Sequence, residues 1–316
     1  MVNGQEPSRG TAPDGRPWSN LRNDMDNRFF PLVVVAVMLA LGLTLTVADF
    51  QRAAKLRRPL AVALVCQAVV LPGLCLLIAE GLNLEPNLAV GLMLMAACPG
   101  GMLANVLSHL VNGDLALNLT LTAVNAVLSI FAIPAILAAS MAWFLGEGRF
   151  IPLQFDKFFA VFGVVLIPTA IGVAIRHRFA DLARRLQNPV RVVAAVLLVV
   201  ALFAGVAGGR STLLRNFGVL SLAIVSFCTI SLTVGYLAPR WMRLEPRQSI
   251  AISLEIGLHN AVVAVGIAMS PQLLNNAEMA TPAAVYGLIA PFIALAFVFT
   301  VRRLDPGYRA ANRQRT

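Results

Sequence analysis

Long apolar runs separated by short polar segments recur along the chain between residues 29 and 301. A helix needs about 20 apolar residues to cross the hydrocarbon core of a bilayer. The pattern predicts an all-α polytopic membrane protein with about nine spans, over residues 29–49, 60–83, 87–111, 115–146, 155–176, 189–208, 216–238, 248–270 and 279–301. The first run is too long for the core of a signal peptide, so we interpret it as a retained span.

The segments outside this transmembrane domain (residues 29–301) differ from it in composition. Residues 1–28 are rich in proline, glycine, asparagine and charge, which predicts a disordered tail. Residues 302–316 form a short basic tail. All the cysteines lie in apolar segments and are predicted to be unpaired thiols that act as small apolar residues: Cys66, Cys75, Cys98 and Cys228.

Charge is scarce and unevenly distributed. Only 13% of residues are charged, about half the fraction of a soluble domain. Counted outward from the first span, 17 Lys and Arg residues fall on one side of the membrane and 8 on the other. The positive-inside rule then places the C-terminus in the cytoplasm and the N-terminus outside. Topology thus explains the net charge of +10, and we predict membrane lipid as the surrounding medium, no nucleic-acid partner and no protein partner.

Two of the predicted spans contain interruptions. The third carries Cys98-Pro-Gly-Gly101, and the eighth carries Glu255, Gly257, His259 and Asn260 without a proline. Non-helical backbone at that depth is tolerated only where it is buried in protein or lines a cavity. The two spans are an odd number apart and cross in opposite directions. This pattern predicts an inverted-repeat bundle with a site built from two discontinuous, crossing helices.

Glu255 is the acidic residue that lies well inside a predicted span. A charged group at that depth costs about 2.5–3.5 kcal/mol even on the lenient insertion scale, so something must compensate it. No Lys or Arg occupies the interior of an apolar segment. We therefore expect Glu255 to bind a cation.

Polar side chains on the fourth span recur at spacings of four, three and four, so they share one helix face: Asn118, Thr122, Asn125 and Ser129. They could be hydrogen-bonding contacts between packed helices. They could also, with Asn105 and Gln67, supply oxygen ligands suited to a hard monovalent cation.

Three segments resemble the bile acid:sodium symporter family: Gly42–Phe50 (GLTLTVADF), Ala96–Val124 (around CPGGMLAN) and Leu254–Ala268 (LEIGLHNAVVAVGIA). Their order and spacing match along nearly the whole chain. The resemblance implies a core domain (60–146 and 216–301) and a panel domain (29–49 and 155–208), in a nine-span bacterial inner-membrane protein. It also implies sodium-coupled symport of an organic anion, a bile-acid-like sterol conjugate or a small carboxylate or sulfonate, by alternating access.

The same resemblance implies two sodium sites when it is carried over residue by residue. The first would use Asn105, Asn118, Thr122 and Glu255. The second would use Gln67, Glu255, the backbone carbonyls of Ile256 and Leu258, and the side chain of His259. Substrate would lie against Asn260 and Met102.

The chain departs from the family pattern at three positions. Ala104 and Met102 stand where members carry hydroxyl residues, and His259 stands where they carry glutamine. Imidazole is a poor sodium ligand and can carry a proton, so His259 either couples to the ion or donates to Glu255. His109 is interpreted as a helix-end residue without function, and Asp114 as the N-cap of the fourth span.

Other functions stay open at this point. One alternative is an organic anion carrier that is proton-coupled or independent of ions. Another is a metalloid oxyanion exporter that uses Cys98 as a soft ligand. An enzyme is not expected, because the sequence offers no nucleophile–base pair and no metal cluster.

Overall fold

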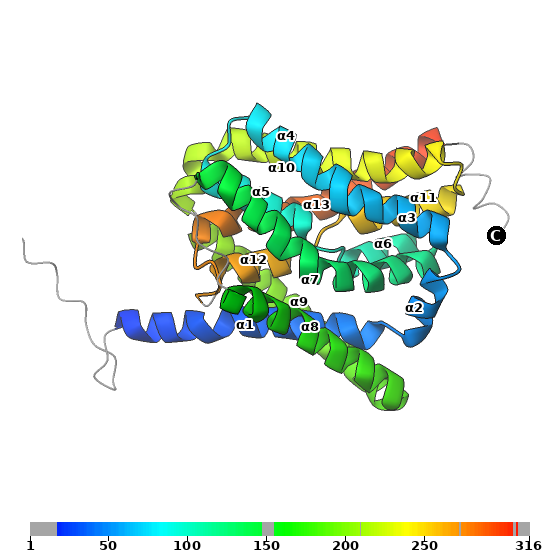
Figure 1. Cartoon of the computed structure of the whole chain (residues 1–316), viewed down its shortest axis with the longest axis horizontal. Coiled ribbons are helices and arrows are strands. Elements are labelled where there is room, and N and C mark those ends of the chain that lie inside the picture. The colour runs from blue at the N-terminus through cyan, green and yellow to red at the C-terminus, as the bar shows by residue number, and fades with distance from the viewer. Residues whose placement is uncertain (1–17, 147–154, 209, 272, 306–307, 309–316) are drawn as a thin grey trace, which may run out of the picture.

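The computed structural model describes residues 18–146, 155–208, 210–271, 273–305 and 308. This part of the chain is helical and contains no β-strand beyond one isolated bridge. The elements are α1 (Trp18–Thr44), α2 (Val47–Ala53), α3 (Arg57–Val65), the π-helical turn η1 (Cys66–Val70), α4 (Leu71–Gly81), α5 (Pro86–Ala97), α6 (Met102–Leu110), α7 (Leu115–Leu145), α8 (Phe155–Arg178), α9 (Ala180–Gly208), α10 (Arg210–Trp241), α11 (Pro246–Gly257), α12 (Ala261–Met269) and α13 (Ala277–Leu304) (Figure 1).

The predicted spans correspond to these helices, but several ends differ: α9 begins at Ala180 instead of 189, and α10 at Arg210 instead of 216. Helix α1 begins at Trp18, so residues 18–28 of the predicted tail are helical in the structure. Helix α13 continues to Leu304, into the predicted basic tail. Residues 1–17 and most of 306–316 lie outside the described residues.

Within the described residues, five continuous helices are long and apolar enough to cross a membrane: Arg57–Gly81, α7, Ala180–Ala204, α10 and α13. The pair α1 and α2, bent by 70°, brings the number to six. The two predicted interrupted spans are each divided into short helices, α5 with α6 and α11 with α12. Helix length and composition by themselves therefore do not confirm a count of nine.

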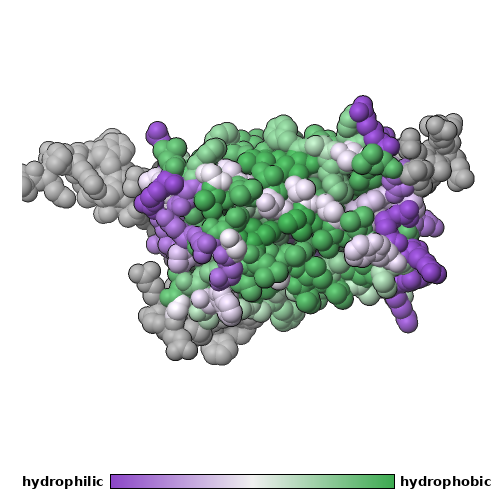
Figure 2. Space-filling view, turned by 90° about the horizontal axis from the view of Figure 1, so that it is seen from above, coloured by the Kyte–Doolittle hydropathy of each residue, from purple (hydrophilic) through white to green (hydrophobic). Residues whose placement is uncertain are grey.

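The outer surface is apolar around its middle. Figure 2 shows a broad hydrophobic band flanked by hydrophilic residues at both ends of the long axis. Large side chains such as Val69, Phe131 and Phe292 are 60–71% exposed. So much contiguous apolar surface is costly in water and is matched by the hydrocarbon of a bilayer. The chain is an integral membrane protein.

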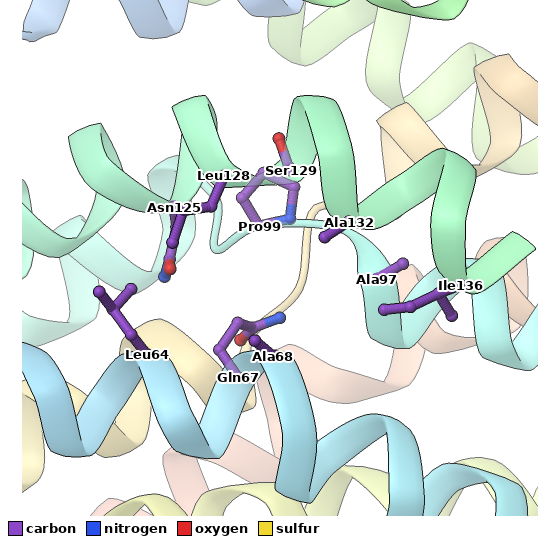
Figure 3. Close-up of a pocket in the computed structure, with 10 residues that line it drawn as sticks. All are labelled: Leu64, Gln67, Ala68, Ala97, Pro99, Asn125, Leu128, Ser129, Ala132 and Ile136. Atoms are coloured by element: carbon purple, nitrogen blue, oxygen red, sulfur yellow. The ribbon is translucent and has the colours of Figure 1, made fainter. Parts of the chain in front are cut away.

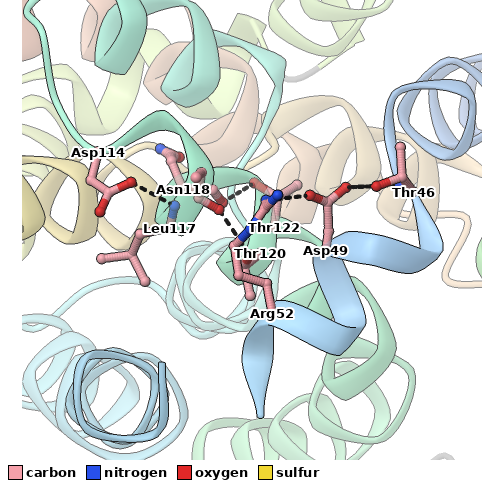
Figure 4. Close-up of polar contacts among 9 residues, drawn as sticks. Thr46, Asp49, Arg52, Asp114, Leu117, Asn118, Thr120 and Thr122 are labelled. Carbon is pink, nitrogen blue, oxygen red and sulfur yellow. Dashed lines mark hydrogen bonds and ion pairs between the residues drawn. The ribbon is translucent and has the colours of Figure 1, made fainter. Parts of the chain in front are cut away.

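The bend between α1 and α2 is held by Asp49, which is buried (Figure 4). Its carboxylate accepts from the backbone N–H of Thr46 at 2.8 Å and from the Thr46 hydroxyl at 2.7 Å. Arg52 completes the group with an N–O distance of 3.0 Å. Thr46 is the N-cap residue of α2, and the Asp49 carboxylate pairs its N–H group as in a capping box.

The helices pack against one another in a connected bundle, in which α9 contacts α13 as well as α1 and α8. Helix α1 packs against α8 and α9, whereas α10 packs against α11 and α13, and α5 packs between α7 and α13. The contact between α1 and α8 is close, because a Cβ on Gly42 would lie 2.3 Å from the carbonyl oxygen of Thr169. Small residues permit such backbone approach between membrane helices.

A π-helical turn positions Gln67 in the middle of the α3–α4 span. The N–H of Leu71 bonds to the carbonyl of Cys66, five residues earlier. Pro72, at the start of α4, has no N–H and its ring opposes the carbonyl four residues before it. The helix therefore widens by one residue at this point, and π-turns of this kind are frequent at functional sites.

Candidate functional site

The two interrupted helices meet backbone to backbone. Gly100 and His259 form an antiparallel bridge. The N–H of Asn260 donates to the carbonyl of Pro99 at 2.8 Å, and the N–H of Gly101 donates to the carbonyl of Leu258 at 3.3 Å. Each break thus supplies a carbonyl acceptor for a backbone N–H group of the other break. In a bilayer such groups must be hydrogen-bonded within the protein.

The first break follows from local sequence. Pro99 disfavours a helical conformation at Cys98, which has φ −71° and ψ 143°. The chain stays extended to Gly101, and α6 starts at Met102. The second break has no proline: α11 ends at Gly257, and the side chain of Asn260 caps α12 by accepting from the N–H of Val263 at 3.4 Å.

Glu255 lies at this crossing and is fully buried. Its Oε2 accepts a hydrogen bond of 2.8 Å from the hydroxyl of Thr122. Its Oε1 has no hydrogen-bond partner. A Cβ on Gly100 would lie 2.5 Å from the carboxyl group, so the glycine leaves the space that the carboxylate fills.

Thr122 joins three of the four residues predicted for the first sodium site. Besides Glu255, it contacts the Asn105 amide, whose Nδ2 lies 3.3 Å from the Thr122 hydroxyl. Asn118, one turn earlier on α7, is fully buried and neither atom of its side-chain amide is bonded (Figure 4). The structure therefore connects Asn105 and Glu255 through Thr122 and places Asn118 on the adjoining turn of α7.

The residues predicted for the second sodium site are more scattered. Gln67 donates through Nε2 to the carbonyls of Ala96 (3.1 Å) and Cys98 (3.3 Å), while its Oε1 has no partner. Ile256 is buried within α11, and the carbonyl of Leu258 already accepts from Gly101.

His259 lies among aromatic rings. Its Nδ1 is 3.3 Å from the hydroxyl of Tyr286. Its ring lies 5.3 Å from that of Phe227 and 5.9 Å from that of Tyr286, measured between centroids. Nε2 is buried without a partner, so the alternative in which this imidazole donates to Glu255 is not realised.

Tyr286 is a site residue that the sequence reasoning missed. Its hydroxyl donates to the carbonyl of Gly257 at 2.5 Å, where α11 ends. A tyrosine inside an apolar span must find a partner for its hydroxyl, and that requirement was the signal available in the sequence.

Of the two residues predicted to contact substrate, the structure describes the side chain of Asn260 only. Asn260 is buried, and its side chain caps α12. Met102 is the first residue of α6, and its side chain lies outside the described residues.

A crevice of about 380 Å³ adjoins Asn105 between α6, α7, the end of α1 and the start of α9. It is lined by Thr44, Asn105, Val106, His109, Leu110, Leu115, Leu119 and Gln187. His109, interpreted from sequence as a helix-end residue without function, thus faces a cavity beside the first predicted ion site.

Two smaller predictions are confirmed. Asp114 caps α7 by accepting from the N–H of Leu117 at 3.0 Å (Figure 4). The four cysteines are all free and buried.

The fold and site define a helical membrane protein with a buried carboxylate at the crossing of two interrupted helices. The sequence model of the Sodium Bile acid symporter family matches residues 31–235, and the chain belongs to this family. It is therefore a member of a family of sodium-coupled transporters and not of a family of enzymes.

Several relatives carry names of the same kind. The chain is 28% identical to the probable sodium/metabolite cotransporter BASS1, chloroplastic, of Arabidopsis thaliana, over 85% of this chain and 65% of that protein. It is 23% identical to the uncharacterized sodium-dependent transporter YocS of Bacillus subtilis, over 87% of this chain and 85% of that protein. It is 29% identical to the human sodium-dependent organic anion transporter, over 65% of this chain and 54% of that protein. The chain thus spans less than two thirds of the plant and human relatives.

Proposed function

We propose that this protein is a secondary active transporter that takes up an organic anion together with sodium. The observation that carries the proposal is the fully buried carboxylate of Glu255, whose Oε2 accepts from Thr122 and whose Oε1 has no hydrogen-bond partner. A buried charge is retained only if it is compensated. Oxygen atoms around one carboxylate suit a hard monovalent cation.

The first sodium ion binds among Asn105, Asn118, Thr122 and Glu255. All four offer oxygen atoms, and they come from the interrupted helices α6 and α11 and from α7. Sodium bound there holds α6 and α11 at a fixed spacing. Substrate that needs this arrangement binds better when sodium is present, and by reciprocity substrate strengthens sodium binding.

The substrate is an organic anion that enters the crevice lined by Asn105, His109 and Gln187. The N-termini of α6 and α12 meet at the crossing, and the positive ends of helix dipoles favour an anionic group. Aliphatic side chains line the same crevice, which suits an apolar body such as a sterol or a short carbon chain.

Alternating access uses a core of α3–α7 and α10–α13 and a panel of α1, α8 and α9. The mutual packing of α1, α8 and α9 supports this division. Together with the interrupted pairs it gives nine spans in a bacterial inner membrane, with the N-terminus outside. In that topology the crevice lies near the cytoplasmic end, and the conformation is inward-facing.

The test is the melting temperature of the purified protein in sodium, potassium and choline chloride at matched ionic strength. A ligand that binds only the folded state raises stability. We expect a sodium-specific rise in the wild type that Glu255→Gln abolishes. Uptake of labelled organic anions into proteoliposomes under an imposed sodium gradient then identifies the substrate. An equal rise in sodium and potassium, or a sodium response retained by Glu255→Gln, would contradict the proposal.

A further inference from the structure

Two side chains just beyond the last turn of α13 are packed against the rest of the protein. Asp305 ends this helix, and its side chain is 16% exposed. Tyr308 follows, and it is 1% exposed. A buried tyrosine hydroxyl must find a hydrogen-bond partner, and a carboxylate withdrawn from water needs donors or a basic group. We call Asp305 and Tyr308 the strap, and their partners show which helices it joins.

Asp305 attaches the strap to α10. Its Oδ2 accepts a hydrogen bond from the hydroxyl of Tyr236 and lies 3.5 Å from Nε of Arg240. Its Oδ1 accepts from the backbone N–H of Tyr308 at 3.1 Å. Hydrogen bonds to an ionised carboxylate are stronger than those between neutral groups. One carboxylate therefore joins the end of α13 to α10 and orients the residue that follows.

Tyr308 extends the strap to α6. Its hydroxyl donates to the carbonyl of Val111, the C-cap residue of that helix. The last carbonyls of a helix have no partner within it. The carbonyl of Ser108 finds one locally, in the N–H of Gly113 at 2.8 Å. The carbonyl of Val111 instead accepts from a side chain 197 residues away in the sequence.

The turn after α6 is also held from α11. Nε of Arg247 donates to the carbonyl of Asn112 at 2.9 Å, and the N–H of Asp114 donates to the carbonyl of Arg247 at 3.0 Å. The ends of α6 and α11 that lie away from the crossing are thus joined to each other. The strap connects this pair to α10 and α13.

Helix α6 depends on such contacts because it is short. It has nine residues, which span about 14 Å, and helices shorter than about 12–15 residues are marginally stable by themselves. Its start is held at the crossing, where the N–H of Gly101 donates to the carbonyl of Leu258, and its end is held at Val111. Asn105 lies between the two ends. A helix of this length moves as one piece, so a displacement at Val111 also displaces Asn105.

We propose that Tyr308 is a positioning residue for the first ion site. Through the carbonyl of Val111 it holds α6, so that the amide of Asn105 stays beside Thr122. The inference rests on the proposed sodium-coupled function. It extends the groups that set sodium affinity to a side chain outside the interrupted helices, which acts through α6 and is not itself an ion ligand.

The experiment compares the purified full-length wild type with Tyr308→Phe, which removes only the hydroxyl. Hydrogen exchange without sodium reports local opening of residues 102–114, and we expect it to be faster in the variant. Melting temperatures over a sodium series, with choline chloride holding the ionic strength constant, report sodium affinity. The sodium concentration needed for a given rise should increase about two- to tenfold, the factor that corresponds to the net contribution of one hydrogen bond.

Thr212→Val is the matched control. Thr212 is 1% exposed, and its hydroxyl donates to Oε1 of Glu278 at 2.7 Å. That bond joins α10 to α13, as Asp305 does, but near the start of both helices and away from α6. The control should melt at a lower temperature, exchange normally in residues 102–114 and keep the sodium requirement of the wild type.

Asp305→Asn gives a second, milder test of the strap. It keeps the shape of the side chain but removes the charge that pairs with Arg240. It should change the exchange and the sodium requirement in the same direction as Tyr308→Phe, by a smaller factor. It also supplies a result if Tyr308→Phe does not fold.

The outcomes separate this inference from the proposed function. If both strap variants keep the wild-type exchange in residues 102–114, the strap does not hold α6 and the inference is overturned. It is also overturned if they melt at lower temperature but keep the wild-type sodium requirement, as expected of Thr212→Val. In both cases a sodium response of the wild type leaves the proposed function standing. A wild type without any sodium response overturns the proposed function and the positioning role together.

Discussion

The hydroxyl of Thr122 on α7 donates a 2.8 Å hydrogen bond to Oε2 of Glu255 on α11, across 133 residues of sequence. This bond joins the fourth predicted span to the second interrupted helix. Asn105, from the first interrupted helix, contacts the same hydroxyl. A single threonine therefore links both interrupted helices to the face of α7.

Replacing Thr122 tests this link directly. Thr122→Val keeps the shape of the side chain but removes an oxygen that we place in the ion site. We expect sodium affinity to fall by about tenfold or more, since an unsatisfied buried carboxylate oxygen costs about 1–3 kcal/mol. Sodium-dependent thermal shifts measure the change.

Thr120→Val is the matched control for that variant. Thr120 is buried on the same helix, and its hydroxyl bonds to the carbonyl of Ala116 in its own helix. Its sodium affinity should equal that of the wild type. Equal losses in the two variants would show that Thr122 acts only through the packing of α7.

Gly100 is predicted to tolerate no side chain. A Cβ there would lie 2.5 Å from the carboxyl group and from the backbone oxygen of Glu255. Gly100→Ala should destabilise the protein by about 1–3 kcal/mol, the usual cost of overpacking, and should weaken sodium binding. Melting temperatures with and without sodium report both effects.

The neighbouring Gly101 supplies the comparison. A Cβ on Gly101 would lie 3.8 Å from Asn260, an ordinary contact. Gly101→Ala should therefore melt and bind sodium much like the wild type. A larger effect at Gly101 than at Gly100 would argue against the close approach of the glycine to Glu255.

The pH dependence of sodium binding tests the role of His259. An imidazole that served as an ion ligand would weaken sodium binding as it protonates, between about pH 7 and 5.5. Because the ring faces Tyr286 and Phe227, we expect the wild type and His259→Phe to show the same profile over that range. A drop in affinity confined to the wild type would place the imidazole at the ion.

Tyr286 should stabilise the second break. Tyr286→Phe removes the donor to the Gly257 carbonyl and the contact with His259. Leaving a buried carbonyl unpaired costs about 1–3 kcal/mol, so the melting temperature should fall. Sodium affinity should fall less than it does in Thr122→Val, because the hydroxyl is bonded to the Gly257 carbonyl and His259 and to none of the residues of the first proposed ion site. The reverse order would make Tyr286 part of the ion site.

The sequence by itself determined the class of fold and the position of its main features. Apolar runs located the membrane-spanning parts of the helices, although α1 and α9 begin well before the predicted spans. Pro99 located the first break, and the isolated Glu255 located the crossing. These signals are local: proline removes a hydrogen bond wherever it stands, and a buried carboxylate always needs compensation. Polar spacing singled out Asn105, Asn118 and Thr122 as possible oxygen ligands, and the family resemblance assigned them to one sodium site. Of these, Asn105 and Thr122 contact each other and Thr122 contacts Glu255.

Only the tertiary structure decided which faces of the helices meet. In a bilayer the lipid-facing and protein-facing sides of a helix are both apolar, so hydropathy gives no orientation. Three features depend on how each helix is rotated about its own axis: the aromatic surroundings of His259, the hydrogen bond from Tyr286 to Gly257, and the crevice beside His109. The same holds for Asn125. Its spacing placed it on the face of Thr122, but the small cavity that it lines together with Gln67 (Figure 3) depends on how η1, α7 and the first break pack together.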